Sequence, residues 1–398
     1  MNKLGVIRTR FDSIFHKIEN IIAKYHRTYL GLVCLFALLG YAFVLLFPVM
    51  IIVSASHIIE IIFAEEAIDV QLISIWTAVL LISTQLSYRV ITTRPVPAVG
   101  FTMPEAKIPR VYELVEKLQS HFKRPTIHRI IITANYELDI VKAPQWMLPI
   151  WSKNTLIIGL PLMMCLSPKQ FEHMVARRIG QFSKQQNPVT NWLYQLRGIW
   201  GQYTYTYDKQ KSPESKLLKW FFMTYDSLYK SVSLYAARTD ELYADTYAME
   251  MYMHDDIREM ITADAVCRWY LNKKFWPAID KVASVKTDVA LNPFRKLSTV
   301  IKGNLNAENI SGLKRLAFKE VPGRGDPVPS LRSRLQNIGH ETPEMFENKG
   351  ENAAEYFLGA SQNGAINLMD KLWFKNNKKK HAKRKIFKNG LMPALKRS

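Results

Sequence analysis

The chain has 398 residues, 48% of them hydrophobic, and a formal net charge of +20. Its three cysteines, Cys34, Cys165 and Cys267, lie far apart and leave one over in any pairing, which excludes a disulfide scaffold and a cysteine zinc site. The basic charge is concentrated toward the C-terminus, so acidic partners are expected there rather than over the whole surface.

Two apolar runs near the N-terminus predict a transmembrane helical hairpin. The first, residues 28–56, contains no charged residue and exceeds the roughly 20 apolar residues that a helix needs to cross a bilayer. The second runs from about Val70 to Tyr88, with only hydroxyl and amide interruptions. We predict spans at about residues 29–53 and 70–88 within an anchor of residues 28–95. A single span with a buried second helix is the alternative.

The charges around these runs predict the orientation of the hairpin. The connection between the runs carries acids but no Lys or Arg, Arg89 and Arg94 follow the second run, and residues 1–27 are basic through Lys3, Arg8, Arg10, Lys17, Lys24 and Arg27. Lys and Arg favour the cytoplasmic side of a membrane. We therefore expect a multi-pass protein of the cell (inner) membrane, with a basic cytoplasmic N-terminal segment and both termini in the cytoplasm.

After Pro95 the composition becomes that of a globular domain, which we assign to residues 96–372. Apolar residues at helical intervals predict a helix over residues 108–122, and β-branched runs predict strands at 130–133 and 154–159. Ser167, Pro168 and Gln170 have the spacing of a helix N-cap, so a helix is expected from there to about Lys184. The predicted fold class is α+β and mainly helical.

Several separated segments carry a family resemblance. They are NTLIIGLPLMMCLSPKQFEHMVARRIGQFS from Asn154, WLYQLRGIW from Trp192, AARTDELYADTYA around Glu241, DPVPSLRSRLQNIG around Arg334, and NAAEYFLG from Asn352. In this order they resemble motifs of the M48 family of membrane-bound zinc metallopeptidases, from about Ile108 to Trp373. The resemblance implies a metallopeptidase-like (zincin-type) domain with zinc as the family's cofactor.

The helix that would bind the metal departs from the family pattern. When AHELGHF is placed on ARRIGQF, the two histidine positions fall on Arg177 and Gln181, and the catalytic glutamate position falls on Arg178. Glu241 matches the third ligand, and Val328 stands where a later motif has a histidine. No catalytic set is therefore intact.

The chemistry of these replacements argues against a metal. In HExxH two histidines, one helical turn apart, hold Zn²⁺, and the glutamate takes a proton from the bound water. Arginine stays protonated, so it neither ligates Zn²⁺ nor accepts a proton. A single carboxylate does not hold catalytic zinc, and we predict no cofactor.

The retained residues predict a structural role for the former metal site. Arg238, Asp245 and Arg334 match family positions and are expected to serve packing and charge pairing. We predict that Arg177, or failing that Arg178, forms a salt bridge with Glu241, and that Gln181 donates a further hydrogen bond. In the alternative, both arginines turn outward and Glu241 pairs with Arg238.

Other candidate site residues have plainer interpretations. His173 is expected to be a surface or packing residue, and His254 to lie at a solvated helix end or turn. The aromatic residues from Tyr203 to Tyr229 are expected to make core or membrane-facing contacts rather than to line a ligand groove.

The segment from residue 373 to 398 is a basic tail without acidic residues. If the hairpin holds the domain at a bilayer, anionic headgroups are close, and each basic residue near them contributes on the order of 1 kcal/mol. A solvated tail is the simpler alternative, and nucleic acid is an unlikely partner because no nucleic-acid fold accompanies the charge. We assign headgroup binding to Lys378, Lys379, Lys380, Lys383, Arg384 and Lys385.

Three functions follow as hypotheses. The leading one is a membrane-anchored, catalytically inactive pseudopeptidase that acts as a scaffold or regulator by binding a membrane or cytoplasmic protein. The second is an active zinc-dependent metalloendopeptidase with unorthodox ligands. The third is a membrane-surface binding protein that acts through its basic tail.

Overall fold

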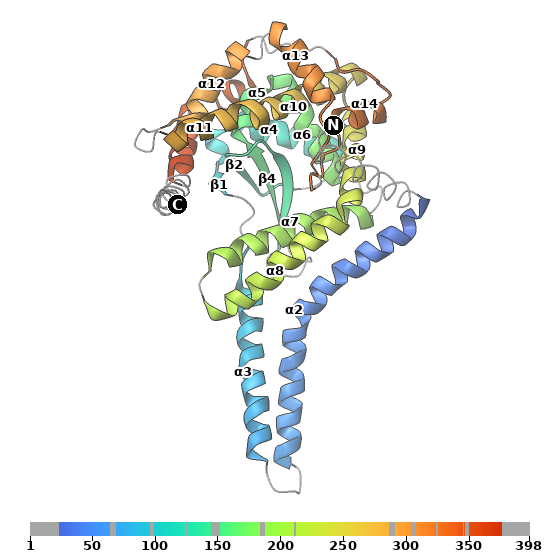
Figure 1. Cartoon of the computed structure of the whole chain (residues 1–398), viewed down its shortest axis with the longest axis vertical. Helices are drawn as coiled ribbons and strands as arrows, with labels where there is room; N and C mark the ends of the chain where they lie inside the picture. The colour runs from blue at the N-terminus through green and yellow to red at the C-terminus, as the bar shows by residue number, and fades with distance from the viewer. Residues whose placement is uncertain are drawn as a thin grey trace, which may run out of the picture. The chain divides into compact units, whose positions relative to one another are not determined.

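The computed structural model of the chain is mainly helical with one small sheet, as the sequence predicts (Figure 1). It forms two compact units. Unit 1 comprises residues 1–97, 142–153 and 186–240, and unit 2 comprises residues 98–141, 154–185 and 241–398. The structure describes residues 24–63, 69–95, 99–123, 126–144, 152–183, 188–210, 212–285, 291–304, 307–323, 325–344, 346 and 350–375.

Unit 1 contains the two apolar helices, α2 (His26–Phe63) and α3 (Val70–Thr92). By length and composition, both could cross a membrane. Asp69 caps α3, because its carboxylate accepts hydrogen bonds from the backbone amides of Gln71 and Leu72, each at 3.0 Å. Helices α2 and α3 run antiparallel (Figure 1), and the imidazole of His57 stacks on the indole of Trp76 with the ring centroids 4.5 Å apart.

The first helix is longer than the span predicted at 29–53. Polar residues appear from Ser54 onward, but the helix continues to Phe63. The serine hydroxyls in this part bond to backbone carbonyls of the same helix. The hydroxyl of Ser54 donates to the carbonyl of Met50 at 2.6 Å, and that of Ser56 donates to Val53 at 2.9 Å. A hydroxyl that bonds within its own helix does not need to end it.

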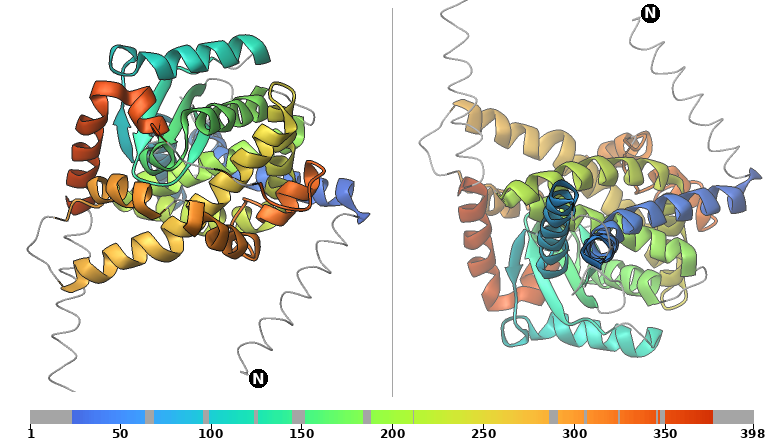
Figure 2. Two further views of the ribbon diagram at one scale, coloured as in Figure 1. Left: turned by 90° about the horizontal axis from the view of Figure 1, so that it is seen from above. Right: turned by 90° about the horizontal axis from the view of Figure 1, so that it is seen from below.

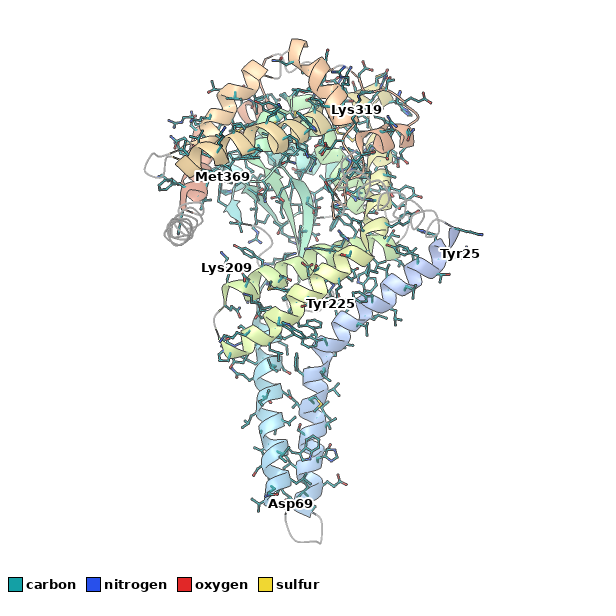
Figure 3. The ribbon with its side chains drawn as sticks, in the orientation of Figure 1. Tyr25, Asp69, Lys209, Tyr225, Lys319 and Met369 are labelled. Atoms are coloured by element: carbon teal, nitrogen blue, oxygen red, sulfur yellow. The ribbon has the colours of Figure 1, made fainter. Side chains whose placement is uncertain are left out.

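The rest of unit 1 is a helical pair, α7 (Pro188–Lys209) and α8 (Pro213–Val232), followed by the first residues of α9 (Leu234–Met249). Tyr203, Tyr207, Phe222 and Tyr229 have no exposed surface and belong to one apolar cluster with residues of α2 and α3. The hydroxyl of Tyr225, marked in Figure 3, donates to the carbonyl of Phe36 at 2.6 Å. These aromatic residues are core residues, as expected.

Unit 2 is built on a four-stranded sheet in the order β1-β2-β4-β3. The strands are β1 (Gly100–Thr102), β2 (Arg129–Thr133), β3 (Leu138–Pro144) and β4 (Ser152–Gly159). The two strands predicted from β-branched runs, β2 and β4, pair in parallel with Ile131 opposite Ile157. The sequence did not predict β1, which is short, or β3, which lies between the two predicted strands in the chain.

Helices pack around this sheet, and two of them begin where the sequence predicts. The first is α4 (Pro109–Phe122), and the second is α6 (Pro168–Ser183). The Ser167 hydroxyl accepts from the Gln170 amide at 3.2 Å, and the Gln170 side chain accepts from the Ser167 amide at 3.0 Å. This reciprocal cap places the start of α6.

The remaining helices of unit 2 lie around the sheet together with α4 and α6 (Figure 2), and their buried residues form one continuous apolar core. They are α5 (Leu160–Cys165), the C-terminal part of α9, α10 (His254–Tyr270), α11 (Trp276–Val285), α12 (Pro293–Asn304), α13 (Ala307–Phe318), α14 (Leu331–Asn337) and α15 (Ala353–Leu358), with the short turns η1 (Glu105–Lys107), η2 (Leu271–Phe275) and η3 (Gly359–Ser361). The predicted tail positions Lys378, Lys379, Lys380, Lys383, Arg384 and Lys385 lie outside the described residues, and the domain boundaries stay predictions.

Candidate functional site

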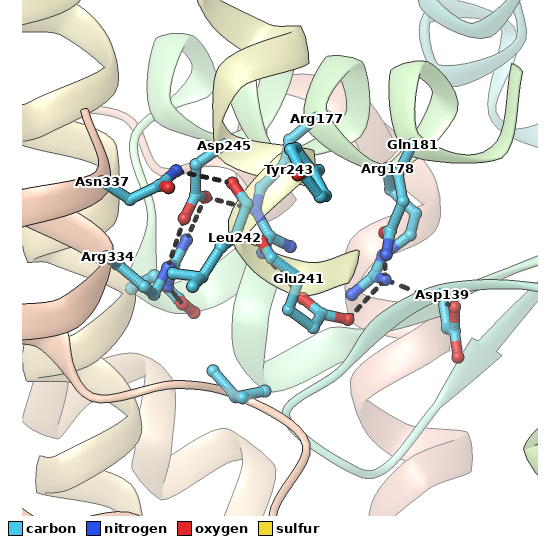
Figure 4. Close-up of polar contacts among 12 residues, drawn as sticks. Asp139, Arg177, Arg178, Gln181, Glu241, Leu242, Tyr243, Asp245, Arg334 and Asn337 are labelled. Carbon is cyan, nitrogen blue, oxygen red and sulfur yellow. Dashed lines mark hydrogen bonds and ion pairs between the residues drawn. The ribbon is translucent and has the colours of Figure 1, made fainter. Parts of the chain in front are cut away.

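The candidate site lies in unit 2, where helix α6 faces the C-terminal part of α9 (Figure 4). Arg177 Nη2 is 2.7 Å from Glu241 Oε2, and Arg178 Nη1 is 2.9 Å from Glu241 Oε1. Only 1% of the Glu241 side chain is exposed, and both arginines are buried. The predicted salt bridge is confirmed, with one difference: both arginines bind the carboxylate, one on each oxygen.

Gln181 contacts the network through a hydrogen bond that it accepts, and the further bond that it is expected to donate stays a prediction. Its side-chain oxygen accepts a hydrogen bond from Arg178 Nη1 at 2.5 Å. Gln181 is one turn after Arg177 and three residues after Arg178, so its amide reaches the guanidinium that approaches Glu241. By accepting this bond, Gln181 helps to orient the guanidinium of Arg178 toward Glu241.

A second carboxylate extends the cluster into a network. Arg177 Nε donates to Asp245 Oδ1 at 2.6 Å, and Nη2 of the same arginine donates to the backbone carbonyl of Glu241 at 2.9 Å. Asp245 in turn accepts two bonds from Arg334, of 3.0 Å from Nε and 2.8 Å from Nη2. Such a parallel two-bond arrangement is the strong form of an arginine–carboxylate pair.

The network ends on helix α10, at a residue that the sequence did not predict. Arg334 Nη1 lies 2.8 Å from Asp264 Oδ2, and Arg268 Nη2 lies 3.3 Å from Asp264 Oδ1. Asp264 matches no motif of the resemblance. The one signal for it is an aspartate within the buried face of an apolar helix, where a charge needs a partner.

The pKa shifts agree with mutual charge stabilisation. Burial alone would raise the pKa of Asp264, but Arg268 and Arg334 outweigh burial and lower it. Burial alone would lower the pKa of Arg334, but Asp245 and Asp264 raise it. We name the set of Arg177, Arg178, Glu241, Asp245, Asp264, Arg268 and Arg334 the arginine–carboxylate network.

Asp139 on strand β3 stands at the edge of this network. Its Oδ1 is 3.8 Å from Arg178 Nη1, and 35% of its side chain is exposed. Burial raises the pKa of Asp139 to about 6, Arg178 counteracts this, and the charge of Glu241 adds to it. The sequence did not indicate Asp139, because strand β3 was not predicted.

The residues at this site do not fit zinc, the ion that the family resemblance implies. Both oxygens of Glu241 accept from guanidinium groups, and the neighbouring positions hold Arg177 and Gln181. Within the described ranges, no three His, Cys, Asp or Glu side chains gather into a group that could hold a metal ion. A protonated guanidinium has no lone pair to offer a metal. We therefore derive no metal-assisted step.

The other sequence candidates occupy structural positions. His173 is buried on α6 and packs against the ring of Tyr252 with centroids 4.2 Å apart, while burial lowers its pKa. His254 is exposed at the start of α10, as expected. Arg238 is half-buried on α9, one turn before Glu241, and Val328 is half-buried with its amide bonded to Asp326 at 2.9 Å.

Comparisons with known families, curated proteins and solved structures yield no match to this chain. The M48 relationship therefore rests on the motifs quoted above and stays a prediction. What the geometry itself defines is a buried arginine–carboxylate network that joins helices α6, α9, α10 and α14.

Proposed function

We propose that this chain is a membrane-anchored, metallopeptidase-like pseudoenzyme that acts as a noncatalytic scaffold or regulator by binding another protein. The observation that carries the proposal is the double pairing of Glu241 with Arg177 and Arg178. These three residues stand where the resemblance places a third ligand, a first ligand and the catalytic base. In this chain each of the two arginines forms an ion pair with Glu241, so the carboxylate is neutralised by side chains of the polypeptide.

The energetics favour a structural use of the site. A carboxylate with 1% exposure would be costly to bury alone, and two guanidinium groups supply both the charge and the hydrogen-bond donors that it needs. Neither arginine can activate water, because neither gives up its proton at working pH. The site is suited to holding α6 against α9, which supports a role for the domain as a binding platform.

The test is metal content and peptidase activity of the purified full-length chain. We expect no stoichiometric zinc and no cleavage of casein, and the same for Arg177→His alone, since the base and the second histidine are still missing. The triple variant Arg177→His, Arg178→Glu and Gln181→His should gain zinc binding. Chelator-sensitive cleavage of casein by the unmodified protein would instead establish the active-enzyme alternative.

The membrane arrangement in this proposal has its own test. Two helices with the length and composition of membrane spans support an integral membrane protein. With both termini cytoplasmic, added protease should digest the tail in sealed vesicles only from the cytoplasmic face. Digestion from the opposite face refutes this topology.

A variant of the basic tail distinguishes this proposal from the hypothesis that the protein acts through the tail alone. Exchanging Lys378, Lys379, Lys380, Lys383, Arg384 and Lys385 for Gln leaves the hairpin and the domain unaltered. If the scaffold proposal is right, the variant still captures from solubilised membranes the partners captured by the unmodified chain. Loss of every such partner would assign the function to the tail.

A further inference from the structure

One face of helix α8 is exposed, apolar and without charge. Leu217, Trp220, Thr224 and Leu228 follow one another at intervals of three or four residues and therefore lie on one side of the helix. The exposed fractions are 46% for Leu217, 68% for Trp220 and 52% for Leu228. We call these four residues the α8 stripe. Among the lysines of α8, Lys216 lies one turn before Trp220 at the border of the stripe, and Lys219 and Lys230 lie outside it.

The opposite face of α8 packs within unit 1 on the first apolar helix. Phe221, at the border of the two faces, stacks on Phe43 of α2 with ring centroids 3.5 Å apart, and Tyr225 stacks on Phe36 at 5.3 Å. Phe36 and Phe43 belong to the apolar run without charges. Helix α8 is thus fixed to the part of the chain with the strongest membrane signal.

The register of the hairpin locates α8 relative to a bilayer. Because His57 lies opposite Trp76 in an antiparallel pair, the 23 residues of α3 lie alongside approximately residues 41–63 of α2. At 1.5 Å per residue, α3 is about 35 Å long, close to the thickness of about 30 Å of a hydrocarbon core. The first part of α2, residues 26–40, continues beyond the paired region.

Helix α8 packs on this continuation and on the first turn of the paired region, which includes Phe43. Val33 and Ala37 of α2 are fully buried in the cluster that contains Leu218 and Phe222 of α8. In unit 1, α7 and α8 cross the hairpin at the end away from the chain reversal between α2 and α3 (Figure 1). Helix α8 therefore lies where the hairpin would leave the hydrocarbon core.

We propose that α8 is an interfacial membrane helix whose stripe contacts lipid acyl chains at the boundary with the headgroups. This inference rests on the membrane anchoring proposed above. Helix α8 carries too many charges to span, and among the described residues only α2 and α3 qualify as candidate spans. A Trp–Leu face with lysines outside it is the composition of helices that lie in the interface. Lysine stems reach from such a position to water.

The interfacial position has a consequence for the chain that follows. Only Ser233 separates α8 from α9, the helix that carries Glu241 and Asp245. Ser233 is buried, and its hydroxyl accepts from Arg197 Nη1 at 2.7 Å and donates to the carbonyl of Tyr229 at 2.6 Å. The proposed lipid-contacting helix therefore directly precedes, in the sequence, the helix that carries Glu241 and Asp245.

Spin-label accessibility of the full-length chain tests the proposal. In a Cys34→Ala background, where the remaining cysteines are fully buried, single nitroxides are placed at Leu217→Cys or Leu228→Cys in nanodiscs that hold one copy each. Lys219→Cys, on the same helix outside the stripe and with 37% of its native side chain exposed, is the matched control. We expect oxygen to collide several-fold more often, relative to a water-soluble nickel chelate, at the stripe than at position 219.

Two results would overturn the proposal. Equal ratios at the stripe and at position 219 would place the stripe in water, and exclusion of both reagents would mean that protein covers the stripe. Resistance of the unmodified chain to alkaline extraction from membranes reports separately on the hairpin, so failure of anchoring is distinguishable. If labelled variants do not fold, brominated lipids should quench a fluorescence component that Trp220→Phe removes; unchanged quenching in that variant contradicts the inference.

Discussion

The interiors of the two units are stabilised by different kinds of contact. In unit 1 most of the buried hydrophobic side chains of α7 and α8 are aromatic, and Tyr203, Tyr207 and Phe222 stack with ring centroids 5.4–6.3 Å apart. In unit 2 an apolar core surrounds the arginine–carboxylate network. The stabilisation from aromatic packing is the sum of many small contacts over the buried area. A buried charge, in contrast, is tolerated only while its partner is present, so the loss of one partner is costly. The two interiors should therefore respond differently to single substitutions.

The largest effect is expected at Arg334, where two carboxylates share one guanidinium. Arg334→Met keeps the volume but takes a partner from both Asp245 and Asp264, which are buried. Breaking a buried pair costs about 3–5 kcal/mol. Urea unfolding followed by circular dichroism should show a loss of this size.

Arg332→Met on the same helix is the matched control. Arg332 is exposed and lies over the ring of Phe318 at 4.9 Å, so its loss should cost no more than about 1 kcal/mol. Equal losses at both positions would contradict the view that burial of the charges sets the cost.

A double-mutant cycle at Glu241 sharpens the comparison. Glu241→Gln should cost about 3 kcal/mol, because Arg177 and Arg178 then lose a buried counter-charge. Combined with Arg177→Met, the total loss should fall short of the sum of the single losses by about 1–3 kcal/mol. Additive losses would show that the two side chains do not stabilise each other.

In unit 1 a pair of conservative substitutions should have smaller effects. Tyr225→Phe removes the hydroxyl bonded to Phe36 at 2.6 Å and should cost about 1 kcal/mol. Tyr203→Phe should be nearly neutral, since its buried hydroxyl has no hydrogen-bond partner within the described part of the chain. Thermal unfolding of both variants in the same detergent measures the two losses of stability. A larger loss for Tyr203→Phe than for Tyr225→Phe would contradict the prediction.

The smallest expected effect is a dependence of stability on pH through Asp139. Its pKa of about 6 in the folded chain lies above the value of about 3.9 for an unfolded aspartate. The folded chain thus holds a proton that the unfolded chain releases, so stability falls as pH rises from about 4 to about 6 and then levels off.

Asp139→Asn should remove this slope from a series of urea unfolding curves. Because 35% of the side chain is exposed, solvent screens the charge and the slope should be shallow. Glu113→Gln, which changes an acid on exposed α4 surface, should leave it unaltered. A slope that persists in Asp139→Asn would assign it to another group.

Local signals in the sequence predicted much of the fold. Helix α6 could be placed because Ser167 and Gln170 cap it through contacts three residues apart, and α4 because its apolar residues repeat with the period of a helix. Strand β3 could not be predicted in this way, because Asp139 and Lys142 interrupt its apolar pattern. Its position is set by pairing with the neighbouring strand β4 rather than by local preference.

The candidate site shows the same division. The pairing of Glu241 with Arg177 follows from a fold in which two helices face each other, so the resemblance was sufficient to predict it. Asp264 and its bond to Arg334 join residues 70 positions apart in the sequence, and nothing in either local pattern connects them.

The double pairing of Glu241 also bears on how the domain matures. The cations that neutralise this carboxylate are part of the polypeptide, so they are present in fixed proportion from the moment of synthesis. A site held by a bound ion is stable only in proportion to ion supply and occupancy. This domain would need no loading step after translation, and we expect it to reach the same stability in zinc-starved and zinc-replete cells.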